Sequence, residues 1–222
     1  DFDEVVYVAW KQNIFINNKK VCGDPIKIWQ SCIDNWKTTK DEKEISAIGF
    51  FSYDFKNILF PNHPFKNKSS TKTPYFWFAK PSKSISRDSY QYDYNKQVIK
   101  LRQDLLDIKK FDQIIKKIKE YLYLGDVYQI NFTQPIIFDY IGEPLDLYLQ
   151  IKDKANPKFG FFLDIDDMQF LSFSPEKFFT KNNKIIKSYP IKGTIKRLNN
   201  LEKDYKQTHQ LQNSLKDKAE HL

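Results

Sequence analysis

The stretch FGFFLDIDDMQFLSFSPEKFF, residues 159–179, decides the fold class of this sequence. It holds two runs, FGFFLDID and MQFLSFS, that are rich in the aromatic and aliphatic residues typical of β-strands. Asp166 and Asp167 lie where the runs meet, and short polar residues at such a point favour a tight turn. The stretch therefore predicts a β-hairpin of two antiparallel strands.

Helix patterns lie on both sides of this hairpin in the sequence. Apolar residues recur at helical spacing in residues 24–38, 111–125, 143–157 and 200–222. The last of these helices is polar and is expected to turn five residues inward: Leu201, Tyr205, Leu211, Leu215 and Leu222. Strand patterns separate the helices and cover residues 5–10, 44–55, 75–80, 126–138 and 184–194. Helices interleaved with hairpins predict an α+β fold, with antiparallel sheets packed as a sandwich between flanking helices in a single domain over residues 1–222.

The composition describes a globular chain with an excess of positive charge. Hydrophobic residues make up 41% of the 222 residues, and the formal net charge is +8. Such a charge suits a nucleic-acid surface, an anionic small substrate or a lysine-rich composition, and the lysines are spread along polar faces, as in the helix over residues 111–125. No apolar run is long enough to span a membrane, and the acidic start does not resemble an export signal. We therefore expect a cytoplasmic protein with Cys22 and Cys32 reduced.

One lysine differs from the others in its surroundings. Lys192 lies in SYPIKGTIKR, between Pro190, which fixes one backbone φ angle, and Gly193, which leaves another free. These neighbours indicate a tight, partly buried turn, and a lysine in such a turn is a candidate nucleophile. A solvated surface charge is the alternative explanation.

Three carboxylates complete the candidate site. Glu176 follows the hairpin in SFSPEKF, and a carboxylic acid near a nucleophile can protonate a leaving hydroxyl. Asp217 and Glu220 share one face of the final helix, because they are spaced i, i+3, and Mg²⁺ prefers such oxygen ligands. Taken singly, Glu176 could be a capping acid, and the pair could be a solvated acidic surface.

Four motifs occur in an order that resembles the family of chorismate-utilising enzymes. They are GDVYQINFTQ (125–134), SFSPEKF (172–178), PIKGTIKR (190–197) and DKAEHL (217–222). The resemblance runs from about residue 48 to the last residue. The form PIKGT resembles that of the para-aminobenzoate branch, the component I type of aminodeoxychorismate synthase. Relatives that make anthranilate normally carry alanine where Lys192 stands, and the resemblance implies an anthranilate synthase component I-like fold.

The resemblance also implies a reaction. Lys192 would attack ring carbon C2 of chorismate, Glu176 would protonate the departing C4 hydroxyl, and ammonia would then add at C4 and release the lysine. The product would be 4-amino-4-deoxychorismate, made by a transaminase-type enzyme of para-aminobenzoate and folate biosynthesis. A glutamine amidotransferase subunit would supply the ammonia, and neither a nucleic acid nor a membrane is expected as a partner.

The same resemblance implies how the substrate is held. Glu220 would bind Mg²⁺ directly and Asp217 through its outer shell, and the metal would hold the ring carboxylate of chorismate. Gly193 and Thr194 would offer hydrogen-bond donors to the bound dianion. Because the family continues past Leu222, we expect this chain to be the front two-thirds of an enzyme, lacking its C-terminal third and inactive alone.

Two other classes of function stay open. An anthranilate or isochorismate synthase is the near alternative, and the lysine at position 192 argues against it. A basic domain that binds single-stranded nucleic acid is the distant alternative, built on positive charge and exposed aromatic rings. The strand patterns argue against it, because they would bury most of five aromatic residues: Phe159, Phe161, Phe162, Phe170 and Phe173.

Overall fold

The computed structural model describes residues 1–9, 12–37, 45–63, 65, 72–85, 95, 97–102, 107–191 and 193–221. These residues fall into two compact units, Asp1–Tyr90 (unit 1) and Gln91–Leu222 (unit 2). The single domain expected over residues 1–222 stays a prediction. Within the described ranges, every helix is too short or too polar to cross a lipid bilayer.

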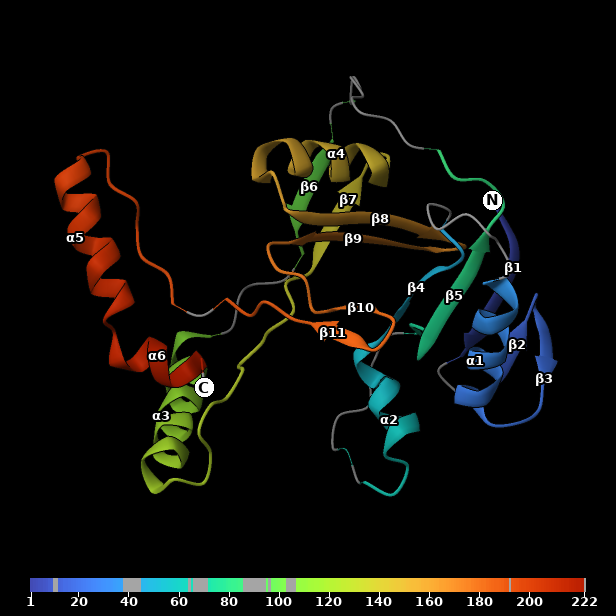
Figure 1. Ribbon diagram of the computed structural model, residues 1–222, viewed down its shortest axis with the longest axis horizontal. Helices are drawn as coiled ribbons and strands as arrows, with labels where there is room; N and C mark the ends of the chain where they lie inside the picture. The colour runs from blue at the N-terminus through green and yellow to red at the C-terminus, as the bar shows by residue number, and fades with distance from the viewer. Residues whose placement is uncertain are drawn as a thin grey trace. The chain divides into compact units, whose positions relative to one another are not determined.

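Unit 1 contains a five-stranded antiparallel sheet with the strand order β3-β2-β1-β5-β4 (Figure 1). The helix α1 begins where Asp24 accepts hydrogen bonds from the backbone N–H groups of Ile26 and Lys27, both at 2.9 Å, because a carboxylate satisfies donors that a helix start leaves free. The elements of unit 1 are β1 (Phe2–Val8), β2 (Ile14–Ile16), β3 (Lys19–Val21), α1 (Pro25–Trp36), β4 (Ile48–Phe51), the 3₁₀ helix η1 (Tyr53–Phe55), α2 (Lys56–Leu59) and β5 (Phe76–Pro81).

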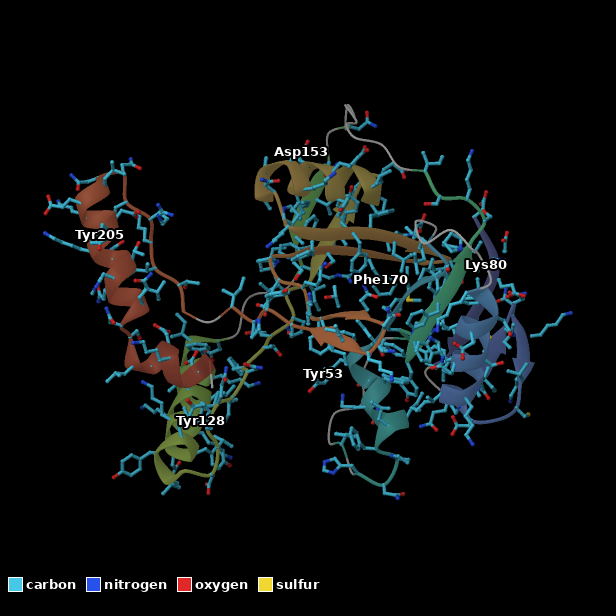
Figure 2. All side chains as sticks on the ribbon, in the orientation of Figure 1. Tyr53, Lys80, Tyr128, Asp153, Phe170 and Tyr205 are labelled. Atoms are coloured by element: carbon cyan, nitrogen blue, oxygen red, sulfur yellow. The ribbon has the colours of Figure 1, made fainter. Side chains whose placement is uncertain are left out.

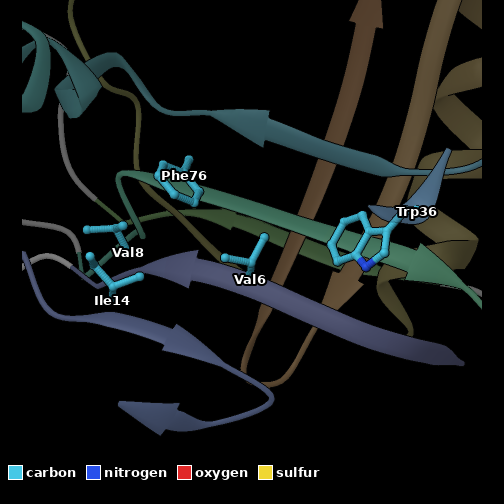
Figure 3. Close-up of a cluster of buried hydrophobic side chains, with 5 residues drawn as sticks. All are labelled: Val6, Val8, Ile14, Trp36 and Phe76. Carbon is cyan, nitrogen blue, oxygen red and sulfur yellow. The ribbon is translucent and has the colours of Figure 1, made fainter. Parts of the chain in front are cut away.

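The core of unit 1 lies between the sheet and α1. Its buried side chains are Val6, Val8, Ile14, Trp36 and Phe76, shown together in Figure 3. Alternate residues of β1 point to the same face of the sheet, which is why Val6 and Val8 are both buried. Burial of these side chains is the main favourable contribution to the stability of the unit.

The strand predicted over residues 44–55 is wrong in its extent, because β4 ends at Phe51. The backbone N–H of Ser52 still donates to the carbonyl of Tyr75, at 2.9 Å, and that of Phe55 then turns back to the carbonyl of Ser52, at 3.0 Å. The aromatic residues that favoured a longer strand therefore lie in η1. The strands predicted over residues 5–10 and 75–80 and the helix over residues 24–38 correspond to β1, β5 and α1.

The hairpin predicted in unit 2 is confirmed. β8 (Phe159–Ile165) pairs antiparallel with β9 (Met168–Ser174), and Asp166 has the positive φ angle, 47°, of a tight turn. The helix α4 (Pro144–Ala155) packs on this hairpin (Figure 1). Tyr148 is only 8% exposed and stacks on Phe173 at a ring-centroid distance of 5.3 Å. The aromatic residues of the hairpin thus support its contact with α4.

The helix α3 (Ile108–Leu124) agrees with the prediction and ends at Gly125, whose φ angle is 76°. The strand predicted over residues 126–138 is wrong, because only Phe138–Ile141 forms a strand, β7, paired with β6 (Val98–Leu101). Pro135 has no N–H to donate, and none of the strands in the described ranges pairs with residues 126–137. Tyr128 in this segment is 75% exposed (Figure 2).

The strand predicted over residues 184–194 is also shorter than expected. Only β11 (Ile185–Lys187) forms, and it pairs antiparallel with β10 (Thr180–Asn182). Residues 188–191 continue without strand pairing, and Pro190 within them lacks the N–H that a ladder needs. Residues 188–191 and 193–200 are therefore loop residues between β11 and the final helices.

The helix predicted over residues 200–222 is two helices, α5 (Leu201–Gln212) and α6 (Leu215–His221). Asn213 ends α5, since its backbone N–H donates to the carbonyl of His209 at 3.1 Å, and the hydroxyl of Ser214 accepts the N–H of Asp217 at 3.2 Å as α6 begins. The prediction that apolar residues of this region face inward is wrong for three of them, which are at least 70% exposed: Leu201, Tyr205 and Leu215. Leu211 is half-buried, and Leu222 lies outside the described residues. The α+β class, with antiparallel sheets and accompanying helices, is confirmed.

Candidate active site

Glu176 is held by a tight turn directly after β9. The hydroxyl of Ser174 donates to the carbonyl oxygen of Glu176, at 2.7 Å, and accepts the Glu176 N–H, at 3.3 Å. Serine favours such local bonds to its own neighbouring backbone, and Pro175 between the two residues restricts the turn further. The half-buried Glu176 carboxylate thus projects from the end of the confirmed hairpin.

The Glu176 carboxylate reaches the loop that follows β11. Its Oε1 accepts the backbone N–H of Ile191 at 3.3 Å. Ile191 is the residue before Lys192, which lies outside the described residues. A carboxylate of unit 2 is therefore bonded to the backbone one residue away from the predicted nucleophile, and its role as a general acid stays a prediction.

Gly193, on the other side of Lys192, lies against Asp217 of α6. Its φ angle is 75°, a conformation that residues with a side chain rarely adopt. A Cβ atom at this position would lie 2.7 Å from the Asp217 Cγ and 2.9 Å from its Oδ1, so the contact also leaves no room for one. Two of the predicted carboxylates, Glu176 and Asp217, therefore meet the residues that flank Lys192.

Glu220 and Thr194 are the remaining predicted site residues. Glu220 lies on α6 and is half-buried, with its Oε1 3.9 Å from the Nζ of Lys216. A pair this long on a surface helix contributes little to stability, so it leaves the Glu220 carboxylate available to other ligands. Thr194 is exposed and follows Gly193 in the same loop.

The side chains of α6 fit one part of an Mg²⁺ site. Asp217 and Glu220 offer the carboxylate oxygens that Mg²⁺ prefers, one turn apart on one helix. In the described ranges, no His, Cys, Asp or Glu residues form a group of three that could hold a metal. Magnesium usually takes one or two carboxylates and completes its shell with substrate and water oxygens, so two carboxylates suit this metal as the contribution of α6.

The sequence patterns missed an ion pair between Arg197 and Asp204. The Nε of Arg197 lies 3.0 Å from Oδ1 and 2.9 Å from Oδ2 of Asp204, and its second terminal nitrogen lies 2.8 Å from Oδ2. The Leu198 N–H also donates to Asp204 Oδ1, at 2.8 Å. Hydrogen bonds from Arg197 and then from Leu198 lower the pKa of Asp204, and the same pair raises the pKa of Arg197. No periodicity in the sequence joins a loop arginine to a helix residue seven positions later, although Arg197 belongs to the stretch that drew attention to Lys192.

A surface hollow in unit 1 contains none of these residues. It is lined by five consecutive residues, Leu59, Phe60, Pro61, Asn62 and His63. Their side chains include neither a carboxylate nor an amine, which is the chemistry that the sequence predicts for catalysis. The candidate site is therefore the set of contacts around residues 191–193 in unit 2.

Comparisons with known proteins agree on one family for this chain. The profile of a family described as chorismate binding enzyme matches residues 8–222. Aminodeoxychorismate synthase component 1 of Escherichia coli is 37% identical over 114 residues, which cover 51% of this chain and 25% of that protein. Anthranilate synthase component 1 of Saccharolobus solfataricus is 26% identical over 238 residues, which cover 97% of this chain and 54% of that protein.

A solved structure supports the fold. Anthranilate synthase component I from Streptococcus pneumoniae superposes with a TM-score of 0.74 at 17% identity, over all of this chain and 57% of its own. This likeness confirms the anthranilate synthase component I-like fold that the sequence predicted. The chain spans between a quarter and just over half of the length of these relatives.

Proposed function

Because the chain belongs to the family of chorismate binding enzymes, we propose that it carries out, as part of the full-length protein, the amination of chorismate at C4. This is the activity of an aminodeoxychorismate synthase component I. The observation that carries the proposal is the bond between Glu176 Oε1 and the Ile191 N–H, which joins a candidate acid to the residue before Lys192. The identity of 37% to the E. coli aminodeoxychorismate synthase component 1 over half of the chain supports this branch of the family.

In the proposed first step, the neutral amine of Lys192 forms a bond to ring carbon C2. The two ring double bonds, C1=C2 and C5=C6, shift to C1=C6 and C4=C5, the C4–O bond breaks, and the hydroxyl leaves as water with a proton from Glu176. The Glu176–Ile191 bond suits this role, since a catalytic acid must be held within reach of its leaving group. Covalent catalysis of this kind divides one difficult substitution into two easier ones.

In the proposed second step, ammonia adds at C4 and both double bonds shift back to C5=C6 and C1=C2. The C2–N bond breaks and returns Lys192 as a neutral amine, while the new ammonium group gives one proton to the Glu176 carboxylate. The net change is loss of water and gain of ammonia, and 4-amino-4-deoxychorismate is the product. Glu176 ends the cycle protonated, ready to act as an acid again.

Substrate binding is assigned to the turn around Gly193 and to α6. Asp217 and Glu220 would hold Mg²⁺, which supplies positive charge to bind the ring carboxylate of chorismate. Thr194 and the backbone of Gly193 would donate hydrogen bonds to the dianion, and the close contact of Gly193 with Asp217 brings the two parts of this surface together.

A second protein component is part of the proposal. The relatives named above are called component 1 of their synthases, which supports a partner component for this chain as well. We propose that it is a glutamine amidotransferase that supplies ammonia. Formation of product from chorismate with glutamine plus the partner, or with an ammonium salt alone, is the corresponding measurement.

Anthranilate formation is the second candidate, because the relative that covers most of this chain is an anthranilate synthase component 1. The two reactions are separated by their products. The full-length protein is incubated with chorismate, Mg²⁺ and an ammonium salt, and the products are identified by mass spectrometry. The proposal predicts 4-amino-4-deoxychorismate, and it is overturned if anthranilate or isochorismate is the product.

A further inference from the structure

The described residues on either side of the proposed nucleophile, 188–191 and 193–200, are attached to their surroundings at separate points. In the first range, the Ser188 hydroxyl donates to the Phe178 carbonyl at 2.7 Å, and the Ile191 N–H donates to Glu176. In the second range, Gly193 contacts Asp217. Farther along, Arg197 and Leu198 both bind one carboxylate, that of Asp204 on α5.

We propose that Asp204 is a positioning residue of the active site, and that it fixes the loop of residues 193–198 to the first turn of α5. The inference rests on the proposed function, because the loop matters only if Lys192, Gly193 and Thr194 act on chorismate. Nothing in the proposed chemistry requires Asp204 to touch the substrate. It acts through Arg197 and Leu198.

The burial of Asp204 explains why its carboxylate holds its hydrogen-bond donors firmly. Asp204 is 7% exposed, whereas the Arg197 side chain is 83% exposed. An arginine this exposed shares its charge with water, so the ion pair alone would contribute little. The bond from the Leu198 N–H, at 2.8 Å, fixes the backbone itself, and a buried carboxylate that lost its donors would be left with its desolvation cost.

The helix that carries Asp204 is itself fixed at the same turn. The Asn200 side chain accepts the Lys203 N–H at 3.0 Å as the cap of α5, and the Asp204 N–H donates to the Asn200 carbonyl at 2.9 Å. The Thr208 hydroxyl also donates to the Asp204 carbonyl, at 3.0 Å. The carboxylate therefore projects from a backbone with little freedom to follow the loop.

These contacts close a ring of chain that includes the proposed substrate-binding residues Gly193, Thr194 and Asp217. The ring runs from Gly193 along the loop to Leu198, through Asp204 into α5, across the break at Asn213 to α6, and from Asp217 back to Gly193. Loss of the Asp204 carboxylate opens this ring between the loop and α5. The distance between Gly193 and Asp217 would then vary, and with it the placement of the amine and the metal ligands. A misplacement of about 1 Å can reduce a rate by about 100-fold.

The first test measures the anchor without reference to catalysis. Hydrogen–deuterium exchange of the backbone amides of residues 193–198 is followed in the full-length protein and in Asp204→Ala, which removes both acceptor oxygens. We expect the Leu198 amide to exchange at least about 10-fold faster in the variant. The matched control is Glu202→Ala, which removes a carboxylate on the same helix whose partner is the exposed Lys206, at 2.8 Å. It should exchange like the wild type, and unchanged exchange in Asp204→Ala would overturn the proposal.

The second test links the anchor to the reaction. In Asp204→Ala we expect kcat for 4-amino-4-deoxychorismate to fall by about 10-fold to 100-fold, more than KM for chorismate rises, and in Glu202→Ala to stay within about twofold. The double variant Asp204→Ala/Arg197→Gln should be no slower than Asp204→Ala, because both act through one contact. Faster exchange with unchanged kcat would overturn the positioning role.

Two controls keep these outcomes distinct. If Asp204→Ala does not fold by circular dichroism, Asp204→Asn replaces it, since it keeps one oxygen for the Leu198 N–H but loses the charge that strengthens the bonds from Leu198 and Arg197. We then expect a smaller change in the same direction, and wild-type values in both measurements would contradict the proposal. If the wild-type protein forms no 4-amino-4-deoxychorismate, the proposed function fails, while amide exchange still decides whether Asp204 anchors the loop.

Discussion

At the scale of single residues, Glu176 connects the fold to the proposed chemistry. The sequence placed it just past a strand, and its carboxylate bonds to the backbone of Ile191, beside Lys192. The local cause is the turn that Ser174 forms with Glu176, which fixes the direction in which the glutamate leaves β9. A glutamate in a mobile loop would have no such direction.

Replacement of Glu176 by glutamine should slow the reaction without weakening binding. Glutamine keeps an oxygen that can accept the Ile191 N–H but cannot donate a proton as an acid does. We expect kcat to fall by about 10²–10⁴-fold in Glu176→Gln, with little change in KM for chorismate. Steady-state kinetics of the full-length protein provide the measurement. Lost binding with preserved turnover would mean that Glu176 only positions the substrate.

Asp204 should make the stability depend on acid pH in a defined direction. Its folded-state pKa is lowered, first by Arg197 and then by the Leu198 N–H, below the usual value of about 3.9 for an unfolded chain. A group with a lowered pKa stabilises the folded state above the unfolded pKa, and this stabilisation is lost as the pH falls through the folded pKa. The free energy of unfolding should therefore differ between wild type and Asp204→Asn at pH 6, and the difference should shrink below about pH 4. Urea titrations over this range measure it, and a difference independent of pH would be inconsistent with this account.

At the scale of elements, α4 packs on the hairpin β8–β9 in unit 2. Tyr148 of α4 contacts the rings of Phe162 and Phe173, at centroid distances of 5.8 Å and 5.3 Å. Gly160 faces the same tyrosine, because a Cβ there would lie 3.1 Å from the Tyr148 hydroxyl oxygen. Since Glu176 comes two residues after the end of β9, this packing helps to hold the candidate general acid in place.

Truncation of Tyr148 should therefore destabilise unit 2. Loss of a nearly buried aromatic side chain leaves a cavity between α4 and the hairpin, and we expect Tyr148→Ala to lower the free energy of unfolding by about 3 kcal/mol. Tyr123 on α3 is 90% exposed, and Tyr123→Ala is the matched control, with an expected change within about 0.5 kcal/mol. Denaturant unfolding followed by circular dichroism compares the two. Equal effects would show that the α4 contact does not stabilise the unit.

Sequence reasoning correctly predicted the elements that are set by local turn and cap residues. It failed for elements whose formation depends on contacts with another part of the chain. The hairpin of residues 159–174, the stop of α3 at Gly125 and the start of α1 at Asp24 follow from turn and cap residues that the sequence displays. The segment of residues 126–138 has a strand-like composition. A strand also needs a partner strand to pair with, and composition does not identify that partner. The break between α5 and α6 depends on the hydrogen bonds of Asn213 and Ser214, which the apolar pattern does not contain.

The candidate site, too, was predicted only in part. The motifs identified Glu176, Gly193 and Asp217, and the contacts around residues 191–193 bring them to one loop. The anchor of Asp204 on Leu198 was missed, because it joins a carboxylate to a backbone N–H. A backbone donor is present at almost every position, so no residue type marks it in the sequence.

At the scale of the whole molecule, we expect residues 1–222 to supply only part of the proposed metal and substrate site, because they cover just over half of the anthranilate synthase component 1 of S. solfataricus. The two α6 carboxylates do not form a closed cage, and Mg²⁺ needs near-octahedral oxygen coordination. We expect the isolated 222 residues to bind chorismate and Mg²⁺ at least about 10-fold more weakly than the full-length protein. Calorimetric titration of both measures this, with Glu220→Gln in the full-length protein as the control for the metal. Equal, tight binding by both would show that residues 1–222 hold the complete site.

The central claim is that Lys192 forms a covalent bond with chorismate, and mass spectrometry tests it most directly. The full-length protein is mixed with chorismate and Mg²⁺ without ammonia, quenched with acid, digested and sequenced by fragmentation. The account predicts that the peptide containing Lys192 gains the mass of chorismate less one water. The gain should be present in Lys187→Ala, which removes an exposed lysine of β11, and absent in Lys192→Ala, which should also form no 4-amino-4-deoxychorismate. An unmodified Lys192 peptide, together with full ammonia-dependent turnover by Lys192→Ala, would contradict the account.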